Sequence, residues 1–218
     1  GFCGMESRDI LPVCLNTLLS SEQYAYMLAD SRAAVLLVSP ALLPALRPAL
    51  AQAPGLAHVI VVGPGAEGGE LDFASLMADA SDDFPTVDTH PDETAFWLYS
   101  SGSTGAPKGT KHVHSSLMDT AKLFGHAVLG LRSEDVVHSA AKLFFAYGLG
   151  NSLTFPMAAG ATTILNPDRP TPAAVFDILE KRQPTIFCGV PTLFAAMLHD
   201  PAHEAHRGSP RLRLSTSA

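Results

Sequence analysis

A short run of glycine, serine, threonine and lysine offers the clearest chemistry in this sequence. It spans residues 99–109, reads Y-S-S-G-S-T-G-A-P-K-G, and directly follows residues 94–98, an apolar stretch typical of a buried strand. Glycines let backbone N–H groups turn inward without obstruction from a Cβ atom, and the hydroxyls and the Lys108 ammonium add further donors. Such a loop is suited to wrapping a polyphosphate.

Two common nucleotide-binding motifs do not fit this run. A Walker A loop requires Gly-Lys-Ser/Thr, but Pro107 precedes Lys108. A dinucleotide-binding fingerprint requires a second glycine two positions after the first, and Thr104 stands two positions after Gly102. A flexible Gly/Ser linker would need neither the Pro-Lys-Gly ending nor the flanking strand and helix signals. The order of the residues therefore favours a phosphate-binding loop over a linker.

A second candidate segment is aromatic. Residues 142–151 read K-L-F-F-A-Y-G-L-G-N. Phe145 and Tyr147 offer flat walls, and Ala146 and Gly148 leave room beside them, as a slot for an acyl or aryl group requires. The alternative is that these aromatic side chains only seal the core, which the residue types alone favour.

These segments must be positioned by alternating helices and strands. Ser20 and Gln23 predict a capping box that opens a helix ending near Ser31. Further helices are predicted over 41–52, 71–80, 114–129, 149–158, 171–182 and 191–199. Strands are predicted over 11–15, 34–38, 58–62, 94–99, 109–113, 136–139, 161–165, 185–188 and 212–218. The helix over 114–129 should bury one apolar face, made of Leu117, Ala121, Phe124 and Val128.

This alternation predicts the α/β class, with mostly parallel sheets flanked by helices. Ligands in such sheets bind at the carboxyl ends of the strands, which is where the 99–109 run lies. The polar segment 82–93, with its two prolines, suggests an internal boundary. We therefore expect two α/β subdomain portions, 1–90 and 91–218, the second carrying the phosphate loop.

Composition narrows the choice of partners. The chain has 218 residues, 47% of them hydrophobic, and a net charge of −7 without a basic block, which argues against nucleic acid or an anionic membrane. Its three cysteines show no metal-binding spacing, which favours a reduced cytoplasmic setting. The first residue is Gly1 and the last ones read as a strand, so we expect a piece of a longer protein.

Several segments resemble a known family. The order Ser-Gly-Ser-Thr-Gly-x-Pro-Lys-Gly at 101–109 is similar to the phosphate-binding signature of the adenylate-forming enzymes, which include acyl-CoA synthetases, luciferases and peptide-synthetase adenylation domains. Within that superfamily the chain resembles the benzoate-CoA ligase branch over residues 15–19, 24–31, 99–109, 111–114, 142–151, 155–157 and 189–192. Residues 5–10 depart from the pattern, because the family tends to have small residues and a glycine there.

The resemblance implies part of the large N-terminal lobe of an ATP-dependent aryl-carboxylate CoA ligase. It implies that the phosphate loop holds the β- and γ-phosphates of ATP through Ser101, Gly102, Ser103, Thr104, Gly105 and Lys108. Thr104 would also join the Mg²⁺ shell. The acyl pocket would be lined by Phe145, Ala146, Tyr147 and Gly148. ATP, Mg²⁺, coenzyme A and a small carboxylate are the implied cofactor and substrates.

No catalytic residue is assigned, because the adenylation lysine of this family would lie beyond Ala218. The isolated chain is therefore expected to be inactive. Alternatives within the same chemistry are a medium-chain acyl-CoA synthetase and a peptide-synthetase adenylation domain. A non-catalytic nucleotide-binding module is an alternative of another class. Sheet faces that are normally covered by further strands could associate with a second copy of the chain, which suggests a homodimer.

Overall fold

The computed structural model describes residues 10–83, 87–100 and 106–218. The chain forms two compact units, one of residues 1–89 with 95–111 and the other of 90–94 with 112–218. Segment 95–111, which the expected division assigned to the 91–218 portion, groups with the first unit. The reason is strand pairing, since Trp97 and Leu98 pair with β1 (Val13–Cys14) near the start of the chain.

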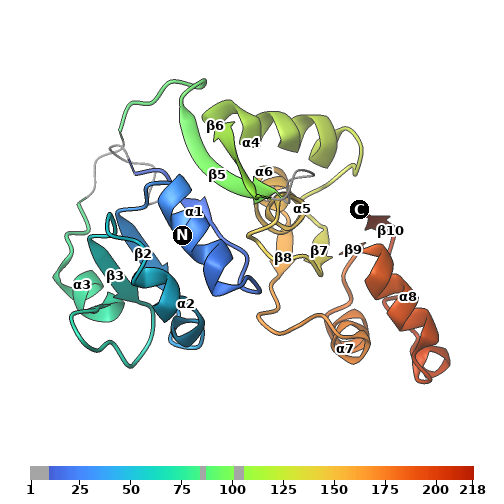
Figure 1. The fold of residues 1–218 in the computed structure, drawn as a ribbon. Coiled ribbons are helices and arrows are strands. Elements are labelled where there is room, and N and C mark those ends of the chain that lie inside the picture. The colour runs from blue at the N-terminus through green and yellow to red at the C-terminus, as the bar shows by residue number, and fades with distance from the viewer. Residues whose placement is uncertain (1–9, 84–86, 101–105) are drawn as a thin grey trace. The chain divides into compact units, whose positions relative to one another are not determined.

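Two sheets make up the first unit (Figure 1). One has the order β2-β3-β4, with β2 (Val35–Val38), β3 (His58–Val61) and β4 (Leu71–Asp72) all parallel. The other has the order β1-β5-β6, in which β5 is Thr94–Ser100 and β6 is Lys108–Val113. The predicted strands 34–38, 58–62 and 94–99 are therefore confirmed, with small shifts at their ends.

Helices α1 (Ser21–Asp30) and α2 (Leu43–Leu50) cover one face of the β2-β3-β4 sheet, and α3 (Phe73–Asp79) follows β4. The predicted capping box opens α1: the Gln23 amide donates to Ser20 Oγ at 3.3 Å, and the Ser20 amide donates to Gln23 Oε1 at 3.0 Å. These bonds satisfy two groups that the helix start would otherwise leave unpaired.

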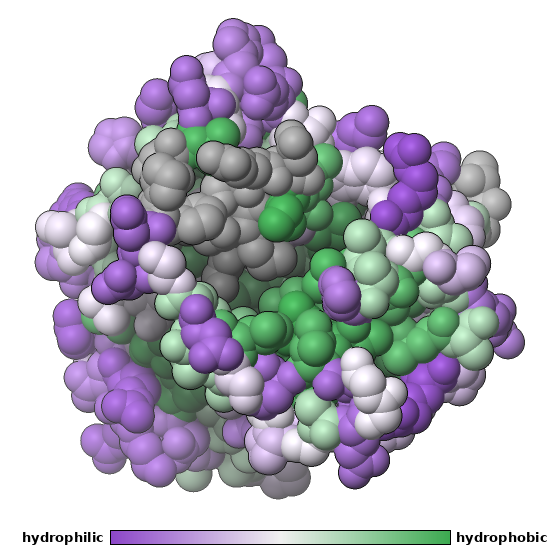
Figure 2. All heavy atoms as spheres, turned by 90° about the vertical axis from the view of Figure 1, so that its left-hand side faces the viewer, coloured by the Kyte–Doolittle hydropathy of each residue, from purple (hydrophilic) through white to green (hydrophobic). Residues whose placement is uncertain are grey.

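The opposite face of the β2-β3-β4 sheet carries exposed apolar side chains. Val35 and Leu37 on β2 are 44% and 42% exposed, and Val62 after β3 is 43% exposed. Figure 2, which views the molecule from the side where β2 and β3 lie in Figure 1, shows apolar residues over a broad area. None of the helices within 10–83, 87–100 and 106–218 has the length and apolar character needed to cross a membrane.

The second unit contains a parallel four-stranded sheet with the order β10-β9-β7-β8. Its strands are β7 (Val136–Ser139), β8 (Thr162–Ile164), β9 (Ile186–Gly189) and β10 (Leu214–Ser217). Because neighbouring residues of a strand point to opposite faces, β9 contributes to two cores. Phe187 packs with α7 (Pro172–Arg182) and α8 (Pro191–His199), whereas Ile186 and Cys188 pack with helical segments from residues 121–155. Both faces are covered, as expected for a parallel sheet.

The remaining helical segments include two π-helices. Along the chain these segments are α4 (His114–Thr120), the π-helix η2 (Ala121–His126), α5 (Ala146–Leu149), the π-helix η3 (Gly150–Thr154), α6 (Phe155–Ala159) and the 3-10 turn η4 (His203–Ala205). The predicted helices 114–129 and 149–158 thus exist, but each contains a π segment and the second begins earlier, at Ala146.

The predicted apolar face of residues 114–129 is wrong in its second half. Phe124 is 39% exposed and Val128 is 65% exposed, while Gly125 and Leu129 are buried. The Leu129 amide bonds to the Phe124 carbonyl at 2.9 Å, five residues back. This wider turn rotates the side chains that follow it, so that the buried stripe moves by one position.

The π-helices meet at the ring of Phe155. A Cβ atom added to Gly125 in η2 would lie 2.8 Å from the Cβ of Phe155, and one added to Gly150 in η3 would lie 2.6 Å from its ring. Phe155 is itself 9% exposed and belongs to the core beneath β7 and β9. Two glycines therefore make the room that this aromatic side chain occupies.

A charged cluster closes the amino-terminal edge of the four-stranded sheet. Asp135, directly before β7, accepts hydrogen bonds from Arg213 Nε at 2.9 Å and Nη2 at 2.5 Å, and from Thr185 Oγ1 at 2.7 Å. The bonds from Arg213 lower the pKa of Asp135 to about 2, and burial opposes this shift. The cluster joins the starts of three strands.

Candidate active site

The carboxyl ends of the four parallel strands lie at the edge of the sheet opposite the Asp135 cluster. The strands end at Ser139, Ile164, Gly189 and Ser217. The aromatic run 142–151 follows the carboxyl end of β7, and its Tyr147 reaches β10. This is the edge where ligands bind in folds of this type.

Tyr147 is the best-fixed residue of the predicted acyl pocket. Its phenol forms a hydrogen bond of 2.8 Å with Thr216 Oγ1, and its backbone carbonyl accepts one of 2.9 Å from Asn151 Nδ2. Its ring packs against the apolar core of this unit. Burial raises the pKa of Tyr147, so the phenol is neutral at physiological pH.

Phe145, Ala146 and Gly148 share the turn that begins α5. Phe145 precedes the helix, is 45% exposed, and its ring lies 4.6 Å from that of Phe144, centroid to centroid. Ala146 is exposed, whereas Gly148 is buried. The structure therefore places the predicted residues on one turn. Tyr147 and Gly148 are more buried than Phe145 and Ala146. Their contact with an acyl group stays a prediction.

Gly148 is a position that only glycine can fill. A Cβ atom added there would overlap the carbonyl group of Lys142, so the turn passes directly over that peptide. Lys142 is held in turn, because its Nζ donates to the carbonyls of Asn166 at 2.6 Å and Asp168 at 2.5 Å. Burial lowers the pKa of Lys142, and the charge of Asp168 partly offsets this.

The hydrogen-bond partners that hold this turn were not predicted from the sequence. Thr216 is 69 residues from Tyr147, and the carbonyls that bind Lys142 are 24 and 26 residues away from it. Backbone carbonyl acceptors leave no trace in residue types. The strand-like end of the chain was the only signal that pointed to Thr216.

The phosphate loop is only partly described. Ser101, Gly102, Ser103, Thr104 and Gly105 lie outside the described residues, and Lys108 is exposed as the first residue of β6. Before the loop, the Tyr99 phenol donates to Asp30 Oδ2 at 2.6 Å and so fixes the end of β5 to the end of α1. Burial is the larger cause that raises the pKa of Tyr99, and the Asp30 carboxylate raises it further.

After the loop, β6 passes close to β5. A Cβ atom added to Gly109 would lie 2.9 Å from the Trp97 ring, and Lys111 Nζ lies 5.5 Å from the centroid of that ring. A side chain at position 109 would therefore collide with the Trp97 ring, which would have to move. The strands on both sides of the loop belong to one sheet, and the sequence predicted each of them as a strand.

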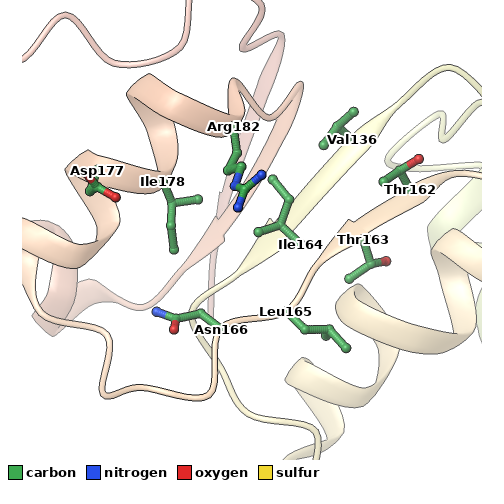
Figure 3. Close-up of a pocket in the computed structure, with 9 residues that line it drawn as sticks. All are labelled: Val136, Thr162, Thr163, Ile164, Leu165, Asn166, Asp177, Ile178 and Arg182. Atoms are coloured by element: carbon green, nitrogen blue, oxygen red, sulfur yellow. The ribbon is translucent and has the colours of Figure 1, made fainter.

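A separate groove of about 640 Å³ lies beside the edge strand β8 (Figure 3). Arg182 and Ile178 of α7 border it on one side and Ile164 of β8 on the other. None of the described residues of the predicted phosphate loop or acyl pocket lines it. Within the described part of the chain, no three His, Cys, Asp or Glu side chains are grouped so that they could hold a metal ion.

The chain is similar to known proteins along its whole length. The family described as AMP-binding enzyme matches residues 2–218. A benzoate–CoA ligase of Thauera aromatica is 54% identical over 217 residues, and a 4-hydroxybenzoate–CoA/benzoate–CoA ligase of Rhodopseudomonas palustris is 48% identical over 217 residues. Both alignments include 100% of this chain and 40% of the relative, so the chain spans about 40% of the length of these curated proteins.

Solved structures agree with this similarity. A benzoate CoA ligase from Burkholderia xenovorans LB400 aligns with a TM-score of 0.82 and 44% identity, over 95% of this chain and 40% of that one. The anthranilate CoA ligase AuaEII, solved with anthranoyl-AMP, aligns with a TM-score of 0.93 and 35% identity, over 99% of this chain and 42% of that one.

Proposed function

This chain belongs to the AMP-binding enzyme family, and we propose that it is part of an ATP-dependent ligase that joins a benzoate-like aryl carboxylate to coenzyme A. The bond formed is a carbon–sulfur bond, so the enzyme is an acid–thiol ligase. Its partners are then a small carboxylate, ATP and coenzyme A.

One observation carries this proposal: two proteins named as benzoate–CoA ligases are 54% and 48% identical to this chain over 217 residues. The position of Tyr147 supports it, because an aromatic side chain at the carboxyl edge of a parallel sheet can form the wall of a pocket for a flat ring. The ring also packs on an apolar core, which would support such a wall from behind.

The proposed reaction has two steps. A carboxylate oxygen first attacks the α-phosphorus of ATP, which gives an acyl-adenylate and pyrophosphate. The thiol of coenzyme A then attacks the acyl carbon, and AMP leaves. Negative charge grows on the phosphate oxygens in the first step, and donors already in place around them lower its energy.

We assign those donors to the phosphate loop. Ser101, Gly102, Ser103, Thr104 and Gly105 would provide amides and hydroxyls, and Lys108 a positive charge. Mg²⁺, when bound, adds positive charge at the phosphates, with Thr104 as a neighbour. A cytoplasmic location and a homodimer are further parts of this proposal; the cysteine pattern favours the location, and the open face of the β2-β3-β4 sheet offers a surface for association.

Carboxylate-dependent pyrophosphate exchange in the full-length protein tests the function. We expect exchange with benzoate and much less with hexanoate or amino acids. A strict preference for hexanoate would favour a medium-chain acyl-CoA synthetase, and a preference for an amino acid would favour an adenylation domain of a peptide synthetase. Nucleotide binding without exchange would favour a non-catalytic module. The isolated 218-residue chain should show no exchange, because one lobe does not complete the transition-state environment.

Lys108→Ala tests the phosphate loop separately. This variant should slow adenylation more than thioester formation from supplied benzoyl-adenylate, because the γ- and β-phosphates are present only in the first step. Lys111→Ala is the matched control, since Lys111 lies on the same strand but over the Trp97 ring. Equal losses in both half-reactions would contradict the phosphate role of Lys108.

A further inference from the structure

Side chains continue the contact between β7 and β8 past the ends of both strands. β8 ends at Ile164, whose carbonyl accepts a hydrogen bond of 3.1 Å from Nδ1 of the buried His138. A carbonyl can only accept, so Nδ1 carries the proton of this histidine. Lys142, which follows the end of β7, donates through Nζ to the carbonyls of Asn166 at 2.6 Å and Asp168 at 2.5 Å. Two side chains therefore hold three alternate carbonyls at and after the end of β8.

The segment that receives the Lys142 ammonium forms a turn of its own. The backbone amide of Asp168 donates to Asn166 Oδ1 at 3.1 Å, and this local bond closes an Asx turn around Pro167. The two carbonyls that Lys142 binds belong to the first and last residues of this turn, so the turn restrains their directions. An ammonium has three donors and can bond to both carbonyls at once. The turn therefore offers Lys142 a preformed pair of acceptors.

The backbone of Lys142 lies directly against the turn that carries the predicted acyl pocket. Its carbonyl accepts the Phe145 amide at 3.1 Å, and the Phe145 carbonyl accepts the Leu149 amide at 2.7 Å, at the start of α5. A Cβ atom added to Gly148 would overlap the Lys142 oxygen, which leaves no space between the two backbones. A displacement of the Lys142 peptide would therefore also displace residues 145–148.

We propose that Lys142 is a positioning residue for the carboxylate substrate: by holding segment 166–168, its ammonium fixes the turn at 142–148 and so sets the affinity of the acyl pocket for an aryl carboxylate. This inference rests on the proposed function, because the pocket is that of the same reaction. The Lys142 side chain is directed to Asn166 and Asp168, so it acts through the backbone and does not need to touch the substrate. Affinity for ATP should not depend on it, since the predicted phosphate donors belong to another segment.

The test uses the full-length enzyme and measures KM for benzoate and KM for ATP separately, from benzoate-dependent pyrophosphate release. Lys142→Met keeps the length of the side chain but removes its donors. It should raise KM for benzoate about tenfold, close to the lower limit for one hydrogen bond from a charged group. KM for ATP should stay within about twofold of wild type. Lys142→Arg keeps the charge and several donors, and should return KM for benzoate to within about threefold of wild type.

Two comparisons separate positioning from a general loss of stability. A residue that only stabilised the fold would lower kcat through the fraction of active enzyme, and both KM values would stay unchanged. Lys181→Met is the matched control, because Lys181 is a lysine of the same unit whose side chain is 72% exposed and pairs with Asp177. Its loss should change neither KM. If Lys142→Met does not fold, Lys142→Gln takes its place in the same comparison.

Asn166→Ala tests whether Lys142 acts through the Asx turn. Loss of Oδ1 frees the Asp168 amide and loosens the two carbonyls, so KM for benzoate should rise about threefold in the wild-type background. In the Lys142→Met background the same change should have no further effect on KM, because no side chain is bound to the carbonyls there. Equal effects in both backgrounds would overturn the proposed route from Lys142 to the pocket.

Hydrogen exchange at the Phe145 and Leu149 amides tests the fixed turn without any activity. Exchange at both amides should be about tenfold faster in Lys142→Met than in wild type, and unchanged in Lys181→Met. Unchanged exchange in Lys142→Met would overturn the role of Lys142 in fixing the turn.

Failure of the proposed function can be told apart from failure of this inference. A wild-type enzyme without benzoate-dependent activity overturns the proposed function, and the exchange experiment still decides whether Lys142 fixes the turn. A wild-type enzyme that activates benzoate, together with an unchanged KM for benzoate in Lys142→Met, overturns the role of Lys142 alone. An equal rise of both KM values also overturns it, since the effect would then not be confined to the acyl pocket.

Discussion

Replacing Asp135 by Asn should destabilise the second unit in a way that depends on pH. The Asp135 side chain is 3% exposed and accepts hydrogen bonds from Arg213 Nε, Arg213 Nη2 and Thr185 Oγ1. An asparagine would place an amide N–H₂ against donors that need an acceptor. Because breaking a buried ion pair leaves a charge without its partner, we expect a loss of about 3 kcal/mol near neutral pH.

The pH dependence follows from the pKa of Asp135. Bonds from Arg213 lower it from 3.8 to about 2 in the folded protein, a difference that corresponds to about 2 kcal/mol. Since the folded pKa is the lower one, this stabilisation is present above about pH 4 and is lost as the pH falls toward about 2. The asparagine variant has no carboxyl group to titrate there. The difference in unfolding free energy between the two proteins should therefore shrink by about 2 kcal/mol over that range.

Urea denaturation followed by circular dichroism between about pH 2 and pH 7 measures this difference. The matched control is Glu134→Gln, which changes the neighbouring carboxylate. Glu134 is 69% exposed and lies 3.9 Å from Arg132, so its loss should change stability by less than about 0.5 kcal/mol at any pH. If the difference in unfolding free energy between wild type and Asp135→Asn stays constant from pH 4 to pH 2, the linkage argument is refuted.

Four other variants test three local features. Ser20→Ala removes the α1 cap and should cost about 1 kcal/mol in thermal or urea unfolding; no loss would mean that the capping box is unimportant. Gly148→Ala forces a methyl group into the Lys142 carbonyl and should cost more than about 2 kcal/mol, or abolish benzoate activation; wild-type behaviour would contradict the close approach. Val128→Lys should be tolerated within about 0.5 kcal/mol whereas Leu129→Lys should prevent folding, and the reverse order would refute the π-helical register.

Local signals in the sequence predicted much of the fold. Ser20 caps α1 as expected, and α7 and α8 match the helices predicted over 171–182 and 191–199 to within one residue. In each case the information is carried within four residues of the helix start, by a side-chain cap or by a proline whose fixed φ suits the first turn. Such signals do not depend on what packs against the helix.

The π segments were not predicted because their cause lies in tertiary packing. Within residues 121–126 only Gly125 departs from an ordinary helical pattern, and a single glycine does not predict a π-helix. The wider turn goes with the approach of Phe155 to Gly125, and these residues are 30 positions apart (155 minus 125). A periodicity of 3.6 therefore placed Phe124 and Val128 on the wrong side.

The candidate site, too, could be predicted from the sequence only in part. Residue types indicated the phosphate loop and the aromatic run, because glycines, hydroxyls and aromatic rings are themselves the chemistry. The partners that fix the run, Thr216 and the carbonyls that hold Lys142, come from distant parts of the chain. Only the folded arrangement shows that Tyr147 has a defined orientation.

The anchored turn around Tyr147 has a thermodynamic consequence. With Lys142, Gly148 and both ends of Tyr147 restrained, little rotational freedom is left to lose when a ring settles against this wall. The entropy cost of ordering this turn is incurred during folding and not during binding. The free energy of binding an aryl ring here should therefore be governed by desolvation of that ring. Calorimetry would then register a negative heat-capacity change and little entropic opposition.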